Sequence, residues 1–342
     1  MSDASVLRDP RLHALARFAG LLGVALAVFA AVLLVFGKNP LRAYVDIFAG
    51  TLGSSYGFSE TLVKMIPLVL AALAVAVPAR IWLINVGGEG QLFVGALSAT
   101  WAAIHLPGLP GWLLLPAMAA LGFVGGGLWA ALAGALRARG WVSETIATLL
   151  MNYVAILLVN FFVFGPWKDP EGVNYPQTAE FPAGALLPTL GGTRVHLGLL
   201  FALVATAVFA FVLARTRWGL EMRAIGGNAE AARRAGISIT RYVVLLMFVG
   251  GGLAGLAGMA EVSAIQGRLR PSLSPGYGYS GFLISWLAGG SPAGIVAASF
   301  VLAVIVAGGD ILQMTQELPG SVVNILMSVV LFVVLGRQGA GR

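Results

Sequence analysis

Residues 19–37 read AGLLGVALAVFAAVLLVFG and carry no formal charge. A helix of about 20 apolar residues crosses a hydrocarbon core of about 30 Å, so this run is long enough for one membrane crossing. Residues 318–335, which read LPGSVVNILMSVVLFVVL, have the same character near the other end of the chain. The sequence shows none of the ten-residue alternation that the strands of a membrane barrel need. These runs predict an all-α polytopic membrane protein.

The composition excludes a water-soluble globule. Of the 342 residues, 58% are hydrophobic and only 10% are charged, whereas about a quarter of a soluble domain is charged. The mean hydropathy is +0.90. The net charge of +7 arises from short basic clusters between apolar runs, where orientation in a lipid bilayer explains them more simply than nucleic-acid binding does. The chain has no cysteine, which excludes disulfides, thiolate catalysis and cysteine-bound metals.

The apolar runs predict about ten membrane spans. They are expected at about 18–37, 62–79, 82–104, 113–136, 145–165, 197–214, 242–260, 280–289, 293–309 and 318–336. The first run is longer than the core of a secretory signal and no small-residue cleavage pattern follows it, so we interpret it as a retained span. The eighth run is too short for a full crossing and ends at GGSP (289–292), which indicates a tilted, broken or re-entrant helix.

The basic residues predict the orientation of these spans. Residues 215–241 carry six arginines against two glutamates, which places this segment in the cytoplasm, whereas residues 168–182 carry one lysine against three acids and belong outside. With an even number of spans, both termini lie inside. The expected organisation is a cytoplasmic segment at 1–17, a transmembrane domain at 18–336 and a cytoplasmic tail at 337–342.

A single carboxylate interrupts the third expected span. In INVGGEGQL (84–92), Glu89 is the only formal charge between Arg80 and Arg137. Such a group near the bilayer centre costs about 3 kcal/mol on insertion scales, so it needs a role. It could be a structural hinge, hydrogen-bonded to Asn85 and Gln91, or it could line the path of a solute. Both readings predict a helix interrupted at 87–90, with a helix N-terminus facing a carboxylate that is buried in protein.

Further polar residues lie inside the spans. They are Asn152, Tyr153, Asn160, Ser285, Trp286 and Asn324. Such side chains either bond neighbouring helices together or contact a solute, and the sequence leaves both roles open. Two glycine pairs with a spacing of four residues, at 122 and 126 and at 251 and 255, predict close helix packing.

The basic segment contains a short amphipathic pattern, NAEAARRAGI (228–237). Asn228 is suited to cap a helix, Glu230 falls in its first turn, and Gly236 is suited to end it. The helix could be an ordinary solvated surface helix. Alternatively, a small-residue face formed by Ala229, Ala232 and Gly236 could enter a groove on a cytoplasmic partner.

The basic segment and two further motifs resemble those of a known family. RAIGGNAEAARRAGI (223–237) is similar to the coupling loop of permease subunits in ATP-binding-cassette (ABC) importers of the branched-chain amino acid, ribose and simple-sugar family. INVGGEGQLFVGAL (84–97) resembles the family's N-x-G-x-E-G-Q signature, and ETIATLLMNYVA (144–155) resembles the start of its fifth span. The GGEGQ and TLLMNY forms are most similar to the nucleoside-uptake branch.

The resemblance implies a type II-like importer permease fold and a non-catalytic subunit of a bacterial inner or plasma membrane, without a metal or cofactor of its own. It implies four kinds of partner: a cytoplasmic ATPase subunit that binds ATP, a second homologous permease, an extracytoplasmic substrate-binding protein and membrane lipid. The sequence fits a subunit that is not the ATPase, because its only Gly-Lys pair, Gly37-Lys38, is not followed by the Ser or Thr of a phosphate-binding loop. The expected substrate is a nucleoside or a simple sugar.

Two groups of candidate residues follow from the motifs. The residues expected to couple to the ATPase are Arg223, Gly226, Asn228, Ala231, Ala232 and Gly236. The residues expected at the broken helix or along the translocation path are Asn85, Gly88, Glu89, Gln91, Asn152 and Tyr153.

Two other classes of membrane protein fit less well. An ion-coupled secondary transporter usually has embedded acids or a Na⁺ site in two repeated halves, and Glu89 has no evident counterpart in the second half, where Asp310 and Glu317 fall at a span edge. A membrane enzyme would need clustered acids or histidines, whereas His13, His105 and His196 are scattered.

Overall fold

The computed structural model describes residues 10–172, 175–319, 321, 325 and 328. The elements are, in order, α1 (Pro10–Val35), α2 (Pro40–Thr51), α3 (Ser55–Ala79), α4 (Gly88–His105), α5 (Gly111–Ala138), α6 (Glu144–Phe164), the short 3₁₀ helix η2 (Ala183–Ala185), α7 (Gly198–Arg215), α8 (Arg217–Gly227), α9 (Ala229–Arg234), α10 (Ile239–Ala260), the π-helix η3 (Glu261–Gln266), α11 (Tyr277–Leu287) and α12 (Pro292–Gln316). Within these residues the only β-pairing is an isolated bridge between Thr189 and His196. The all-α prediction is confirmed.

Each of the first nine expected spans coincides with a helix, and most of the tenth (318–336) lies outside the described residues. Within the described part of the chain, six helices are long and apolar enough to cross a membrane: α3, α5, α6, α7, α10 with η3, and α12. The end of α1 and helix α2 form a pair bent by 115°, which would make a seventh span.

Helix α2 is absent from the sequence-based expectation. It contains Arg42 and Asp46 within 12 residues, so it lacks the apolar run that identifies a span. Its start nevertheless follows from local chemistry, because the Asn39 side chain accepts the Leu41 and Arg42 amides at 3.0 and 3.3 Å and Pro40 occupies the first turn.

The chain divides into two compact units. One comprises residues 1–61 and 301–342, and its core contains Phe29, Leu33, Ala43, Leu312 and Leu318. The other comprises residues 62–300 and holds both groups of candidate residues.

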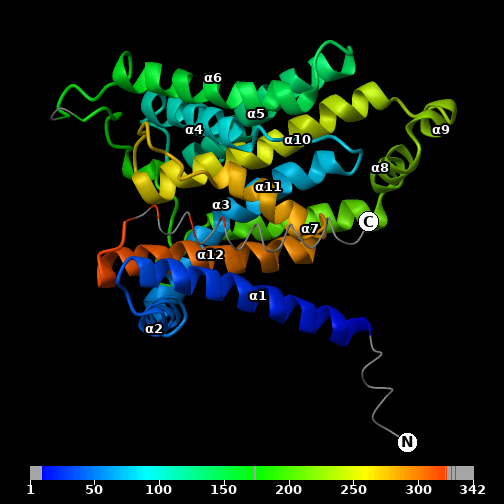
Figure 1. The fold of residues 1–342 in the computed structure, drawn as a ribbon. Coiled ribbons are helices and arrows are strands. Elements are labelled where there is room, and N and C mark those ends of the chain that lie inside the picture. Colours follow the sequence, from blue (N-terminus) through cyan, green and yellow to red (C-terminus); the bar gives the residue numbers. More distant parts are fainter. Residues whose placement is uncertain (1–9, 173–174, 320, 322–324, 326–327, 329–342) are drawn as a thin grey trace, which may run out of the picture. The chain divides into compact units, whose positions relative to one another are not determined.

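Three helices, α4, α5 and α10, lie against one another at the centre of the second unit (Figure 1). Glycine permits this approach. A Cβ atom on Gly255 would lie 2.1 Å from the carbonyl oxygen of Gly122, and one on Gly126 would lie 2.4 Å from that of Gly251. The predicted role of the two glycine pairs in close packing is thus confirmed.

Candidate functional site

The chain between α3 and α4 is not helical, and most of the candidate path residues gather beside it. We call residues 80–89 the strap. Helix α4 begins only at Gly88, so the third span, expected from residue 82, starts later than predicted. Trp82 in the strap adopts a left-handed conformation with φ of 62°, which is uncommon for a residue other than glycine.

Asn85 in the strap and Gln91 in the first turn of α4 form hydrogen bonds with each other. The Asn85 amide nitrogen donates to Gln91 Oε1 at 3.0 Å and to the Ala74 carbonyl at 3.1 Å, and Gln91 Nε2 donates back to Asn85 Oδ1 at 2.8 Å. Both side chains are buried. The expectation that these two amides bond to Glu89 is wrong, because they satisfy each other.

Glu89 instead bonds to a helix that lies far away in the sequence. Its carboxylate accepts the Gly278 amide at 2.7 Å, at the start of α11, and only 3% of the residue is exposed. The Ser274 side chain and the Gly276 backbone approach the same carboxylate. The positive end of a helix dipole stabilises a carboxylate. Glu89 lies in the first turn of α4, as predicted, and it also contacts the first turn of α11, which the sequence did not predict.

Helix α6 presents three polar side chains to the strap at intervals of four residues, Glu144, Thr148 and Asn152. Thr148 Oγ1 accepts the Val86 amide at 3.2 Å, and Asn152 Nδ2 donates to the Val86 carbonyl at 2.9 Å. Asn152 Oδ1 also accepts the Gly90 amide at 2.8 Å. The predicted interruption of a helix at 87–90 is therefore wrong, because residues 80–87 form a non-helical link and α4 is continuous from Gly88. Side chains of α6 satisfy backbone groups of this link, which have no helical partners.

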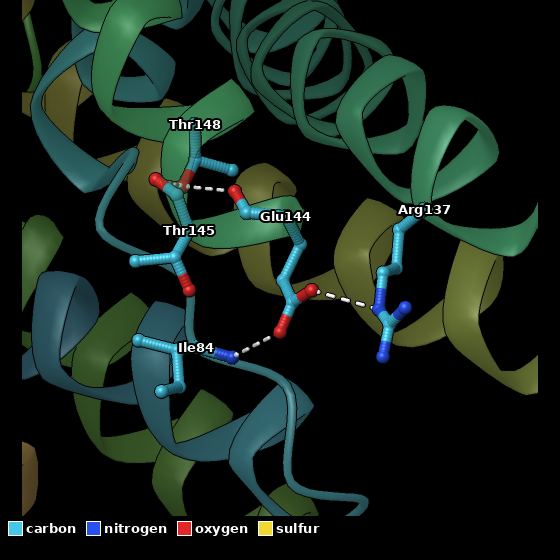
Figure 2. Close-up of polar contacts among 5 residues, drawn as sticks. All are labelled: Ile84, Arg137, Glu144, Thr145 and Thr148. Atoms are coloured by element: carbon cyan, nitrogen blue, oxygen red, sulfur yellow. Dashed lines mark hydrogen bonds and ion pairs between the residues drawn. The ribbon is translucent and has the colours of Figure 1, made fainter. Parts of the chain in front are cut away.

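Glu144 lies about one turn before Thr148 in α6 and faces Ile84 and Arg137 (Figure 2). Its carboxylate accepts the Ile84 amide at 3.3 Å and forms an ion pair with Arg137 Nε at 2.9 Å. Thr148 donates to the Glu144 carbonyl at 2.7 Å. Glu144 and Thr148 were not among the residues predicted from the sequence, although their four-residue spacing from Asn152 places all three on one helix face.

Tyr153 does not join this cluster. It is 60% exposed on the outer face of α6, whereas Asn85, Gly88, Glu89, Gln91 and Asn152 are buried together. The structure thus brings five of the six candidate path residues together.

The second group of candidates lies in residues 215–241, which we call the coupling segment. It forms α8 and the six-residue helix α9. The Asn228 side chain accepts the Ala231 amide at 3.0 Å, and Gly236 follows the helix with φ of 86°, so the predicted cap and stop are confirmed. Arg223 donates to the Leu213 carbonyl, which fastens α8 to the end of α7.

The predicted small-residue face of α9 is partly wrong. Ala232 is only 4% exposed and points into the protein, whereas Ala229, Ala231 and Gly236 are exposed. Ala231, and not Ala232, therefore belongs to the surface that a partner could reach. A pocket of about 590 Å³ lies beside α9 and is lined by residues that include Ile81, Leu83, Arg137, Ala229, Arg233 and Ile237.

Glu221 in α8 ties the coupling segment to the start of α10. It accepts the Tyr242 hydroxyl and pairs with Arg217 Nε at 2.6 Å. The Tyr242 hydrogen bond, followed by the Arg217 contact, lowers the pKa of the Glu221 carboxyl. The carboxylate is therefore charged at neutral pH and can hold both partners.

Glu261 is a further buried acid that was not predicted from the sequence. The seventh span was expected to end at residue 260, but the helical chain continues through the π-helix η3 to Gln266, so this buried acid is embedded. Lys64 of α3 lies close enough to interact with its charge. Single-turn π segments recur at functional sites, and the cue in the sequence was a glutamate that directly follows an apolar run.

Comparisons with known proteins agree with this architecture. Residues 57–335 match the family described as the branched-chain amino acid transport system permease component. A glucose ABC transporter permease protein of Haloferax volcanii is 37% identical, with 92% of this chain and 85% of that protein covered. A nucleoside ABC transporter permease protein of Lactococcus lactis is 31% identical (89% and 85% covered), and a guanosine ABC transporter permease protein of Bacillus subtilis is 30% identical (91% and 90% covered).

The fold is also found in solved structures. A metal-chelate type ABC transporter in an inward-facing conformation superposes with a TM-score of 0.50 at 16% identity, with 94% of this chain and 98% of that chain covered.

Proposed function

The chain belongs to the permease components of the branched-chain amino acid transport family and is a multi-pass ABC transporter permease, and on that premise we propose that it imports a nucleoside or a simple sugar. The observation that carries the substrate class is the similarity to two nucleoside permeases and one glucose permease over about nine tenths of this chain. In this proposal an extracytoplasmic binding protein delivers the solute, and the permease itself is not catalytic.

The polar cluster at the strap suits such a solute. Asn85, Gln91 and Asn152 have amide groups of the kind that bind sugar hydroxyls. All three are buried and hydrogen-bonded to the protein, so in this proposal they meet the solute by exchanging those bonds during the transport cycle. A permease must release what it passes, so a path with modest polar contacts fits transport better than a deep, tightly binding site. We assign these residues, with Gly88 and Glu89, to the translocation path.

In the same proposal the coupling segment and both termini face the cytoplasm, where a partner ATPase binds and hydrolyses ATP. The exposed face of α9, with Ala229, Ala231 and Gly236, is the docking surface, and Arg223, Gly226 and Asn228 fix the shape of the segment beneath it. A second, homologous permease completes the path.

Uptake in a strain that lacks this chain tests the proposal. Cells complemented with the wild-type gene should accumulate radiolabelled guanosine, uridine or glucose, and a permease variant Ala231→Arg should abolish uptake and weaken co-purification of the ATPase. The matched control is Ala179→Arg, an exposed alanine in the loop expected outside, which should still co-purify with the ATPase. Normal uptake and normal co-purification with Ala231→Arg would remove the coupling assignment.

A further inference from the structure

The strap holds the short helix α11 at both of its ends. At the N-terminal end, Glu89 accepts the Gly278 amide at 2.7 Å. At the C-terminal end, the Arg80 guanidinium donates to the Gly290 carbonyl, just beyond the last turn of α11. Ten residues of chain thus contact both ends of an 11-residue helix that lies almost 200 positions later in the sequence.

The two contacts are made by charged side chains of opposite sign. A helix dipole places positive charge at the N-terminus, so the Glu89 carboxylate is favourable at the start of α11. The Arg80 guanidinium donates to a carbonyl of the turn that joins α11 to α12, which ties down the other end of the helix. The Arg80 guanidinium also stacks over the Phe209 ring of α7, 5.3 Å from its centroid. Two polar anchors of opposite charge, on one short segment, oppose sliding of α11 in either direction relative to the strap.

The strap also contacts the coupling segment directly. Trp82 Nε1 donates to the Gly226 carbonyl at 2.6 Å. A Cβ atom on Gly226 would lie 2.5 Å from the Arg80 carbonyl oxygen, so only glycine permits this approach of two backbones. Arg80 therefore touches the coupling segment through its backbone and α11 through its side chain.

The conformation of Trp82 indicates that these contacts are maintained at a cost. A left-handed φ of 62° is unfavourable for a bulky residue and persists only where the surrounding structure fixes it. Burial does not fix the ring, because Trp82 is 76% exposed. The hydrogen bond to Gly226 is the directional contact that orients the indole.

We propose that the strap transmits movement of the coupling segment to α11, with Arg80 and Trp82 as positioning residues for transport. This inference rests on the proposed function, since it requires that an ATPase moves the coupling segment. Movement of α9 and α8 reaches the strap at Gly226, and the strap carries α11 with it through Arg80 and Glu89. Because α11 begins against the polar cluster at Glu89, its displacement opens or closes the path there.

The test compares Trp82→Phe with Trp141→Phe in the complete transporter, reconstituted with its ATPase, second permease and binding protein. Phenylalanine keeps an aromatic ring at residue 82 but cannot donate to Gly226. Trp141 is also an exposed tryptophan, and it stacks on Arg139 through its ring face, which phenylalanine retains. Trp82→Phe should lower solute transported per ATP hydrolysed at least fivefold while the ATPase still co-purifies, and Trp141→Phe should change that ratio less than twofold.

A second measurement follows α11 itself. Because the chain contains no cysteine, Ser291→Cys places a single thiol at an exposed position just after α11. Its rate of reaction with a water-soluble maleimide should change on ATP binding in the otherwise wild-type chain, and this nucleotide effect should be lost when Trp82→Phe is added. Arg80→Met should also abolish the nucleotide effect, and Arg80→Lys should restore it in part.

Three results would each overturn the proposal that the strap transmits movement. They are an unchanged transport ratio in Trp82→Phe, a nucleotide effect on residue 291 that persists in that variant, and loss of ATPase co-purification. These outcomes are separable from failure of the proposed function. If Ala231→Arg leaves transport intact, the coupling segment itself is wrongly assigned, whereas loss of transport in Ala231→Arg with normal coupling in Trp82→Phe refutes only the strap.

Discussion

Glu89 offers the sharpest test of the polar cluster, because two substitutions separate its hydrogen bond from its charge. In Glu89→Ala the Gly278 amide loses its acceptor in a buried site, which costs about 1–3 kcal/mol. The N-terminus of α11 also loses a negative charge, worth about 0.3–2 kcal/mol. In Glu89→Gln the amide oxygen can still accept the Gly278 bond, and the loss of charge at the helix N-terminus is offset because an ionised group no longer has to be buried.

We therefore expect Glu89→Gln to unfold close to the wild-type midpoint and Glu89→Ala to be less stable than both, by roughly 1–3 kcal/mol for the lost acceptor. The assay is the midpoint of thermal unfolding of the purified protein, run beside uptake by the same variants in cells. Glu171→Gln, in an exposed loop, is the control and should not shift the midpoint. If Glu89→Ala unfolds at the wild-type midpoint, the carboxylate does not hold α11, and the reasoning fails.

Three further substitutions test other parts of the fold. Glu144→Ala should destabilise the protein by about 1–3 kcal/mol in the same unfolding assay, because the Ile84 amide loses its acceptor. Gly255→Ala should prevent folding, since its Cβ would lie 2.1 Å from a carbonyl oxygen of α5, whereas Gly108→Ala, with nothing within 4 Å, should give a monodisperse peak on size-exclusion chromatography. Burial lowers the pKa of His196 to about 4 against an ordinary value near 6.5, so the unfolded state binds the extra proton and stability should fall as pH drops below about 6.5. Between pH 7 and pH 5 this contributes about 2 kcal/mol of destabilisation, which His196→Phe should remove from the pH dependence of the unfolding midpoint.

Local chemistry in the sequence was sufficient for much of the fold. Apolar runs of about 20 residues predicted helices because length and hydropathy alone decide whether a segment can cross a bilayer. Asn228 and Gly236 marked the ends of α9 because capping depends on neighbouring backbone amides. The glycine pairs in α5 and α10 predicted close packing because a four-residue spacing places both glycines on one helix face.

The partners of the polar side chains could not be predicted in the same way. Glu89 bonds to Gly278, and Trp82 bonds to Gly226, across 189 and 144 residues of chain. No local periodicity encodes which distant amide a carboxylate will meet. The nearest amides in the sequence, Asn85 and Gln91, were the natural expectation for Glu89, and the structure pairs them with each other.

Orientation within a short helix was a second limit. A six-residue helix has fewer than two turns, so the sequence of α9 is compatible with more than one buried face. Ala232 points inward only because α9 packs against the rest of its unit, and this contact depends on the tertiary fold. The embedded acid Glu261 was missed for a related reason, since the expected span ended one residue before it and the π-helix that extends the span has no simple hydropathy signature.

The strap explains why a membrane protein would retain irregular backbone inside an apolar domain. A helix satisfies its own amides, whereas the non-helical strap depends on side chains of α6 and on Asn85 of the strap itself. Each such hydrogen bond contributes about 1 kcal/mol net, so exchanging a few of them shifts the balance between two conformations by the few kcal/mol that a conformational switch requires. A continuous helix would have to lose whole turns to change shape. A break held by separate polar contacts, and fastened to both the coupling segment and α11, can rearrange at lower cost, which is the property that a transport cycle needs at this place in the fold.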